Sequence, residues 1–183
     1  MVDFVGRVFA AIPMPAEVRL ALDEKLQQHL LPGKVAPPEN WHFTLRFLGN
    51  VDEVTYQRFL AELDTADLGR RFRVALSGLG AFPNPKRATV LWVGVSQGED
   101  EMSELALTTE EAAQAAGLPP EDRPFHPHLT LSRIRPQVDV TTLIESLGDT
   151  GIGWRCETMV VYRSQLGRAG ARYETLEIFN LRR

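Results

Sequence analysis

The pattern His-x-Thr-Leu occurs twice in the chain, with its histidines at His42 and His128 and its threonines at Thr44 and Thr130. Because side chains alternate faces along a β-strand, each copy would place His and Thr on one face and apolar residues on the other. Histidine exchanges a proton near neutral pH, and a threonine hydroxyl can hydrogen-bond an oxyanion. Two such strands that face each other would form an acid/base pair.

Two imidazoles and two hydroxyls favour phosphoester cleavage by direct attack of water. One histidine would deprotonate the attacking oxygen, the other would protonate the leaving oxygen, and the hydroxyls would bind the non-bridging oxygens, where negative charge gathers. Neither pattern carries a Ser, Cys or carboxylate placed as in a hydrolase triad, which disfavours a covalent acyl mechanism. In-line displacement needs the two histidines on opposite sides of phosphorus, and two lobes that face across a cleft would supply that geometry.

A metal site is the main competing use of histidine. His126 and His128 could point the same way along a strand, but Pro127 lies between them and no Asp, Glu or Cys cluster completes a ligand set. We therefore expect no metal and no cofactor.

Two arginines follow the histidines closely. Arg46 shares the strand parity of His42, so it would face the cleft and bind substrate or lie at a solvated strand end. Arg133 has the opposite parity to His128, so regular pleating would turn it away, and only a strand end or a bulge would bring it to the phosphate.

Aromatic side chains fall into two groups. Trp41, Phe43 and Trp92 have apolar neighbours in the sequence, so we expect them in the core rather than stacked on a base. Tyr162 and Tyr173, together with Arg163, are candidates for contacts with a base or a sugar.

Length and composition indicate one globular domain. The 183 residues are 44% hydrophobic and 24% charged, and no apolar stretch approaches the roughly 20 residues that span a bilayer. We read no secretory signal at the N-terminus, and the single cysteine, Cys156, is expected as a small buried hydrophobe, so we expect a cytoplasmic protein without a membrane partner. The net charge of −4 argues against coating nucleic acid by bulk electrostatics but allows a local basic cleft.

The two halves of the chain have the same predicted order of strand, helix, motif strand, helix and strand. The first half would have strands at 7–12, 41–48 and 72–79 and helices at 16–31 and 51–63. The second would have strands at 89–95, around the second motif, at 154–164 and at 173–181, and helices at 102–116 and 138–147. We therefore predict a single domain over 1–183 with pseudo-twofold symmetry, its repeats spanning about 1–85 and 86–183.

Several stretches carry a resemblance to a known family. They are RVFAAIP at 7–13, ENWHFTLRFLG at 39–49, PHLTLSR at 127–133, and the late segments at 162–166 and 170–173. At these residues the chain resembles the two-histidine phosphoesterases, and within them the bacterial and archaeal RNA 2′,3′-cyclic phosphodiesterases, also called 2′-5′ RNA ligase or LigT-like proteins.

The resemblance implies a bilobal α+β fold in which two antiparallel sheets line a central cleft, helices lie outside, and elements can cross between lobes. It implies metal-independent hydrolysis of a terminal 2′,3′-cyclic phosphate to a 2′-phosphomonoester. His42 corresponds to the proton donor and His128 to the proton acceptor. Thr44 and Thr130 correspond to phosphate-binding positions, and Arg133 to the arginine that follows the second motif.

Two other functions remain open at this point. Family members can also join RNA ends through a 2′-5′ linkage, because the same two proton transfers run backwards. A non-catalytic module that binds RNA ends is the third hypothesis. The expected partners are RNA or oligonucleotide ends with a 2′,3′-cyclic phosphate and small cyclic nucleotides, bound by a monomer.

Overall fold

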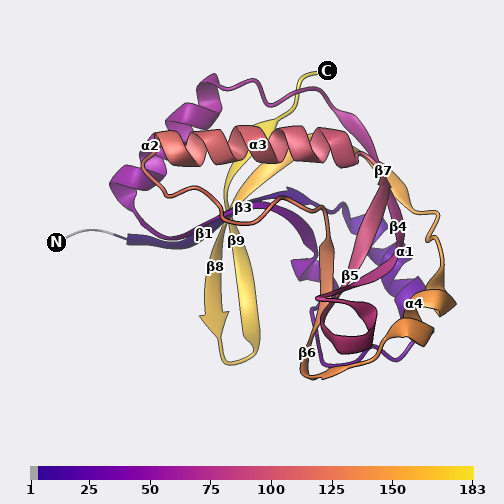
Figure 1. Ribbon diagram of the computed structural model, residues 1–183. Coiled ribbons are helices and arrows are strands. Elements are labelled where there is room, and N and C mark those ends of the chain that lie inside the picture. Colours follow the sequence, from indigo (N-terminus) through magenta and orange to yellow (C-terminus); the bar gives the residue numbers. More distant parts are fainter. Residues whose placement is uncertain (1–3) are drawn as a thin grey trace.

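The computed structural model describes residues 4–183 as two lobes of mixed secondary structure (Figure 1). The helices within this range are α1 (Ala16–Leu26), α2 (Glu53–Thr65), α3 (Glu99–Ala115) and α4 (Thr141–Leu147), with short 3₁₀ turns at Pro38–Asn40 and Pro85–Arg87. The strands are β1 (Phe4–Pro13), β2 (Lys34–Val35), β3 (His42–Asp52), β4 (Phe72–Phe82), β5 (Ala88–Gln97), β6 (Leu129–Val138), β7 (Gly153–Cys156), β8 (Thr158–Gly167) and β9 (Gly170–Asn180).

The strands form two antiparallel sheets. One has the order β3-β1-β8-β9 and the other the order β2-β6-β5-β4-β7, which confirms the predicted two-lobed α+β fold. Figure 1 shows α3 running along the upper side of the molecule, with the β8–β9 hairpin and the β5–β6 pair descending below it on different sides. The motif strands β3 and β6 belong to different sheets, so each lobe contributes one histidine.

Each lobe contains strands from both halves of the sequence. In the first lobe β1 pairs with β3 and with β8, and in the second β5 pairs with β6 and with β4. Thus β4 leaves the first half to join the second lobe, and β8 returns from the second half to join the first. The two lobes therefore do not coincide with the two halves of the sequence.

Several element boundaries differ from the sequence-based expectation, and three of the differences have a direct structural reason. The helix predicted to reach residue 31 ends at Leu26, because the apolar repeat does not continue into the core: Leu30 is 95% exposed. The strand predicted over 154–164 is divided at Glu157 into β7 and β8, which lie in different sheets. The helix predicted from residue 138 begins at Thr141, since β6 continues to Val138.

The predicted core residues are largely confirmed. Trp41 and Phe43 are buried, as is Cys156, whose pKa burial raises to about 12, so its thiol stays protonated. Trp92 is only half-buried and packs against His126 and His128 rather than in the core. Within residues 4–183 no helix combines the length and the apolar character needed to cross a bilayer.

Candidate active site

A cleft of about 900 Å³ contains most of the residues singled out from the sequence. Thr44 lines it from β3. Thr130 and Arg133 line it from β6, and His128 lines it from the position just before β6. His42 adjoins this group, because its Nε2 lies 2.9 Å from the Thr44 hydroxyl. The charge of His128 also lowers the pKa of His42, so the two imidazoles lie within electrostatic reach of each other.

The ring of His42 is held in one orientation. Its Nδ1 lies 2.7 Å from the carbonyl oxygen of Asn40, to which it donates, and this leaves Nε2 facing Thr44. Phe9 and Tyr173 pack on the ring with centroids 4.9 Å and 5.2 Å away. Burial lowers the pKa of His42 to about 4, against the opposing effect of the Asn40 carbonyl.

His128 is held in a corresponding way. Its Nδ1 donates to the carbonyl oxygen of His126 at 2.7 Å, again two residues earlier in the chain. The edge of Phe82 meets the ring at a centroid distance of 5.1 Å, and His126 stacks at 6.3 Å. Burial lowers the pKa of His128, and the charges of His126 and Arg133 lower it further. Both rings therefore keep Nε2 for chemistry and are neutral in the free protein at pH 7.

A β-bulge follows the motif in each strand. Ala10 and Ala11 of β1 pair with Arg46 and Thr44, so Leu45 has no partner. Leu91 and Trp92 of β5 likewise pair with Ser132 and Thr130, which skips Leu131. Such an extra residue shifts the alternation of side chains beyond it by one position.

The second bulge reverses the parity argument for Arg133. Arg133 lines the cleft, where regular pleating would have turned it away. Arg46 also lines the cleft, as its parity predicted, but its side chain is buried to 8% exposure at the position equivalent to Ser132. The exposed position after the first bulge belongs to Phe47, the counterpart of Arg133.

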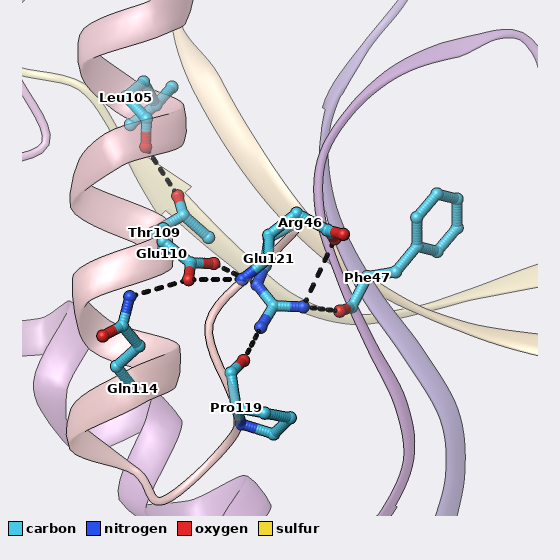
Figure 2. Close-up of polar contacts among 8 residues, drawn as sticks. All are labelled: Arg46, Phe47, Leu105, Thr109, Glu110, Gln114, Pro119 and Glu121. Atoms are coloured by element: carbon cyan, nitrogen blue, oxygen red, sulfur yellow. Dashed lines mark hydrogen bonds and ion pairs between the residues drawn. The ribbon is translucent and has the colours of Figure 1, made fainter. Parts of the chain in front are cut away.

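The guanidinium of Arg46 is fully engaged by protein groups (Figure 2). Nε pairs with Glu110 of α3, one terminal nitrogen donates to the carbonyl of Phe47, and the other donates to the carbonyl of Pro119 at 2.5 Å. Glu121 lies 3.6 Å from the same guanidinium. Arg46 therefore joins β3 to α3 and to the segment that leads to His128, and it does not offer a free cation to substrate.

A sequence signal was available for the second bulge. After the second motif the apolar positions change their spacing from two residues to three, from Leu131 to Ile134, whereas after the first motif Phe47 keeps the spacing of two and hides the shift. Sequence reasoning also missed the two backbone carbonyls that orient the histidines, for which no residue-type signal exists. It considered His126 only as a metal ligand, whereas His126 lines the cleft together with His128.

Two antiparallel sheets that each present a His-x-Thr strand to the region of one cleft define a two-histidine phosphoesterase. The sequence model of the family described as LigT like Phosphoesterase matches the chain twice in succession, over residues 12–92 and 93–173. The chain belongs to this LigT-like phosphoesterase family.

Similar proteins cover most of the chain. An Aeropyrum pernix protein named RNA 2′,3′-cyclic phosphodiesterase is 37% identical over 150 residues, which cover 80% of this chain and 85% of the relative. A Thermus thermophilus protein of the same name is 36% identical, with 96% of this chain and 90% of the relative covered. The crystal structure of E. coli LigT in apo form has a TM-score of 0.83 and 26% identity, covering 97% of this chain and 98% of that one.

Proposed function

We propose that this protein hydrolyses the 2′,3′-cyclic phosphate at RNA ends to a 2′-phosphomonoester, with His42 as proton donor and His128 as proton acceptor. The observation that supports this most directly is the pair of imidazoles, each oriented through Nδ1 by a backbone carbonyl and each beside a motif threonine. The names of the relatives support the same substrate class.

In the proposed reaction the two imidazoles exchange protons with substrate and water. The Nε2 of His128 takes a proton from a water molecule, whose oxygen forms a bond to phosphorus. The bond from phosphorus to the 3′-oxygen breaks, and the Nε2–H of His42 protonates that leaving oxygen. The products are a 2′-phosphate and a free 3′-hydroxyl, with the proton now on His128 returned to solvent and His42 reprotonated.

The lowered pKa values are consistent with one histidine acting as proton donor and the other as general base. Protonated His42 is a strong acid because its burial disfavours the charged imidazolium, so it gives up its proton readily to an alkoxide leaving group. The negative charge of a bound phosphodiester raises the pKa of both rings and favours the protonated form of the donor in the complex. Neutral His128 is already in the state that a general base requires at pH 7.

The remaining cleft residues would bind the phosphate itself. Thr44, Thr130 and Arg133 line the cleft together with His128, and the Thr44 hydroxyl lies 2.9 Å from Nε2 of His42. They are suited to hydrogen-bond the non-bridging oxygens as negative charge develops on them. We assign Arg46 a positioning role, because its nitrogens already bind Glu110 and two carbonyl oxygens.

Product analysis on an oligonucleotide that ends in a 2′,3′-cyclic phosphate tests this proposal. The purified protein, incubated in excess EDTA, is expected to yield an end with a 2′-phosphate and no 3′-phosphate. A 3′-phosphate product would contradict the assignment of the leaving oxygen. A 2′-5′-joined product formed from two RNA ends would support ligation instead, and binding without turnover would support the non-catalytic alternative. Activity lost in EDTA and restored by a divalent ion would indicate a metal-dependent reaction.

A further inference from the structure

The cleft is larger than the reacting phosphate requires. Its volume of about 900 Å³ lies toward the upper end of the roughly 300–1,000 Å³ found for sites that enclose one small ligand. Thr44, His128, Thr130 and Arg133 lie on its strand walls, whereas α3 and the segment 121–126 form another wall. Given the proposed function, this second wall is available to the rest of the substrate.

Large apolar side chains are exposed to solvent in the cleft. Phe47 of β3 is 57% exposed and Leu107 of α3 is 59% exposed, and both line the cleft together with half-buried Phe125. Exposed apolar residues gathered in a concavity typically mark a ligand site. A flat nucleoside, whose base has two apolar faces, matches such a surface.

One cation on this wall has no protein partner. Arg123 lines the cleft and is exposed, and within residues 4–183 it makes no ion pair or side-chain hydrogen bond. Arg46 differs, since Glu110 and Glu121 already compensate its charge. With three arginines and two glutamates, the cleft lining has a net charge of +1 when its histidines are neutral, in a chain whose net charge is −4.

The Arg46 contacts hold this wall in place before substrate arrives. Arg46 binds the carbonyl of Pro119 and lies 3.6 Å from Glu121, while the Glu110 carboxylate accepts from the backbone N–H of Glu121 at 2.9 Å (Figure 2). The segment that carries Arg123 and Phe125 is thereby joined to α3 and to β3. A preorganised wall costs less conformational entropy on binding than a loose one.

We propose that Arg123 binds the phosphate on the 5′ side of the terminal nucleoside, while the nucleoside itself lies against Phe47, Leu107 and Phe125. In an RNA strand the terminal ribose carries this phosphodiester as its link to the preceding nucleotide. A cyclic mononucleotide lacks it. The protein would therefore bind strand ends in preference to mononucleotides that have the same reacting group.

Calorimetric binding of two product analogues tests the subsite without any need for turnover. Adenosine 2′-monophosphate and adenosine 2′,5′-bisphosphate differ only in the 5′-phosphate. The wild-type protein is expected to bind the bisphosphate about tenfold more tightly, as for one charge-assisted contact. In Arg123→Gln the ratio of the two Kd values should fall to near one, whereas the control Arg58→Gln, on the exposed side of α2, should keep the wild-type ratio.

A second variant tests the contribution of the apolar surface to binding independently of Arg123. Leu107→Ser, at an exposed position of α3, is expected to weaken both analogues by about threefold or more and to leave their ratio unchanged. Equal affinity of the wild type for the two analogues would overturn the proposal, as would a ratio that Arg123→Gln does not alter. Hydrolysis of adenosine 2′,3′-cyclic phosphate by the wild type is scored separately. Its absence would count against the proposed function, whereas a missing 5′-phosphate preference alongside intact turnover would overturn the subsite alone.

Discussion

Leu45 of β3 and Leu131 of β6 hold the same place in the two lobes. Each follows its motif threonine directly, and each is skipped by the register of the neighbouring strand. Both are buried, so the backbone bulges while the apolar side chain stays in the core. The position two residues beyond the bulge then faces outward, where the first lobe has Phe47 and the second has Arg133.

Variants of the two motif histidines, compared on substrates with different leaving groups, should distinguish the proton donor from the proton acceptor. His42→Ala and His128→Ala are each expected to lower kcat by about 10²–10⁴-fold, the usual effect of losing one acid/base group. A substrate with sulfur in place of the bridging 3′-oxygen leaves as a thiolate and needs no proton donor. His42→Ala should recover most of its lost rate on this substrate, and His128→Ala should not. Rescue of His128→Ala instead would show that the roles are reversed.

The motif threonines should contribute to turnover and little to folding. Thr44→Val and Thr130→Val remove a hydrogen-bond donor to the phosphate at nearly constant volume, and each is expected to lower kcat/KM by about 10²-fold. Both side chains are only half-buried, so the free energy of unfolding in urea should change by less than about 1 kcal/mol. A variant that instead unfolds would show that its hydroxyl is structural.

Arg133 and Arg135 offer a matched pair on one strand. Both are exposed on β6, but only Arg133 lines the cleft. Arg133→Gln is expected to lower kcat/KM by about tenfold or more through the loss of a charge-assisted contact with phosphate, while Arg135→Gln should stay within about twofold of wild type. Similar losses in both variants would point to a diffuse electrostatic effect.

The contributions of Arg46 and Glu110 to the free energy of unfolding should depend on each other. Burial opposes the charge of Glu110, but hydrogen bonds from Glu121, Gln114 and Arg46 keep its pKa below the ordinary value. Arg46→Met leaves this carboxylate without its main counter-ion and is expected to destabilise by about 3 kcal/mol or more. The double variant with Glu110→Gln should lose less than the sum of the single variants, as urea unfolding would show. Strictly additive losses would rule out the coupling.

The lowered pKa values of His42 and His128 should place the pH optimum of the reaction below neutral pH. Because both pKa values are lowered in the free protein, the bell-shaped profile of kcat/KM should have its maximum below pH 6.5. A maximum well above pH 7 would contradict these environments.

The lowered pKa of His42 also predicts a pH-dependent free energy of unfolding. His42 has a folded pKa of about 4 against 6.5 for a histidine in water, so the unfolded chain takes up its proton first as pH falls. This contribution to stability is complete above pH 6.5 and is lost progressively between pH 6.5 and 4, by up to about 3 kcal/mol. His42→Asn should flatten this part of the curve, whereas a curve of unchanged slope would argue against the buried neutral imidazole.

Local patterns in the chain were sufficient for the chemistry and the class of fold. The repeated His-x-Thr strands, the order of helices and strands, and the burial of Trp41 and Phe43 depend on periodicity and residue type, which neighbouring residues express directly. The two His-x-Thr strands lie in different sheets, as the repeat predicted.

Only the tertiary structure decided where the side chains beyond each motif point and what surrounds them. The register between β1 and β3 and between β5 and β6 creates the bulges that bury Arg46 and expose Arg133. The strand exchange that divides 154–164 between two sheets, and the burial that lowers the pKa of His42, likewise arise from segments far apart in the chain. Strand pairing and burial are non-local, so a pattern that runs along one strand carries little information about them.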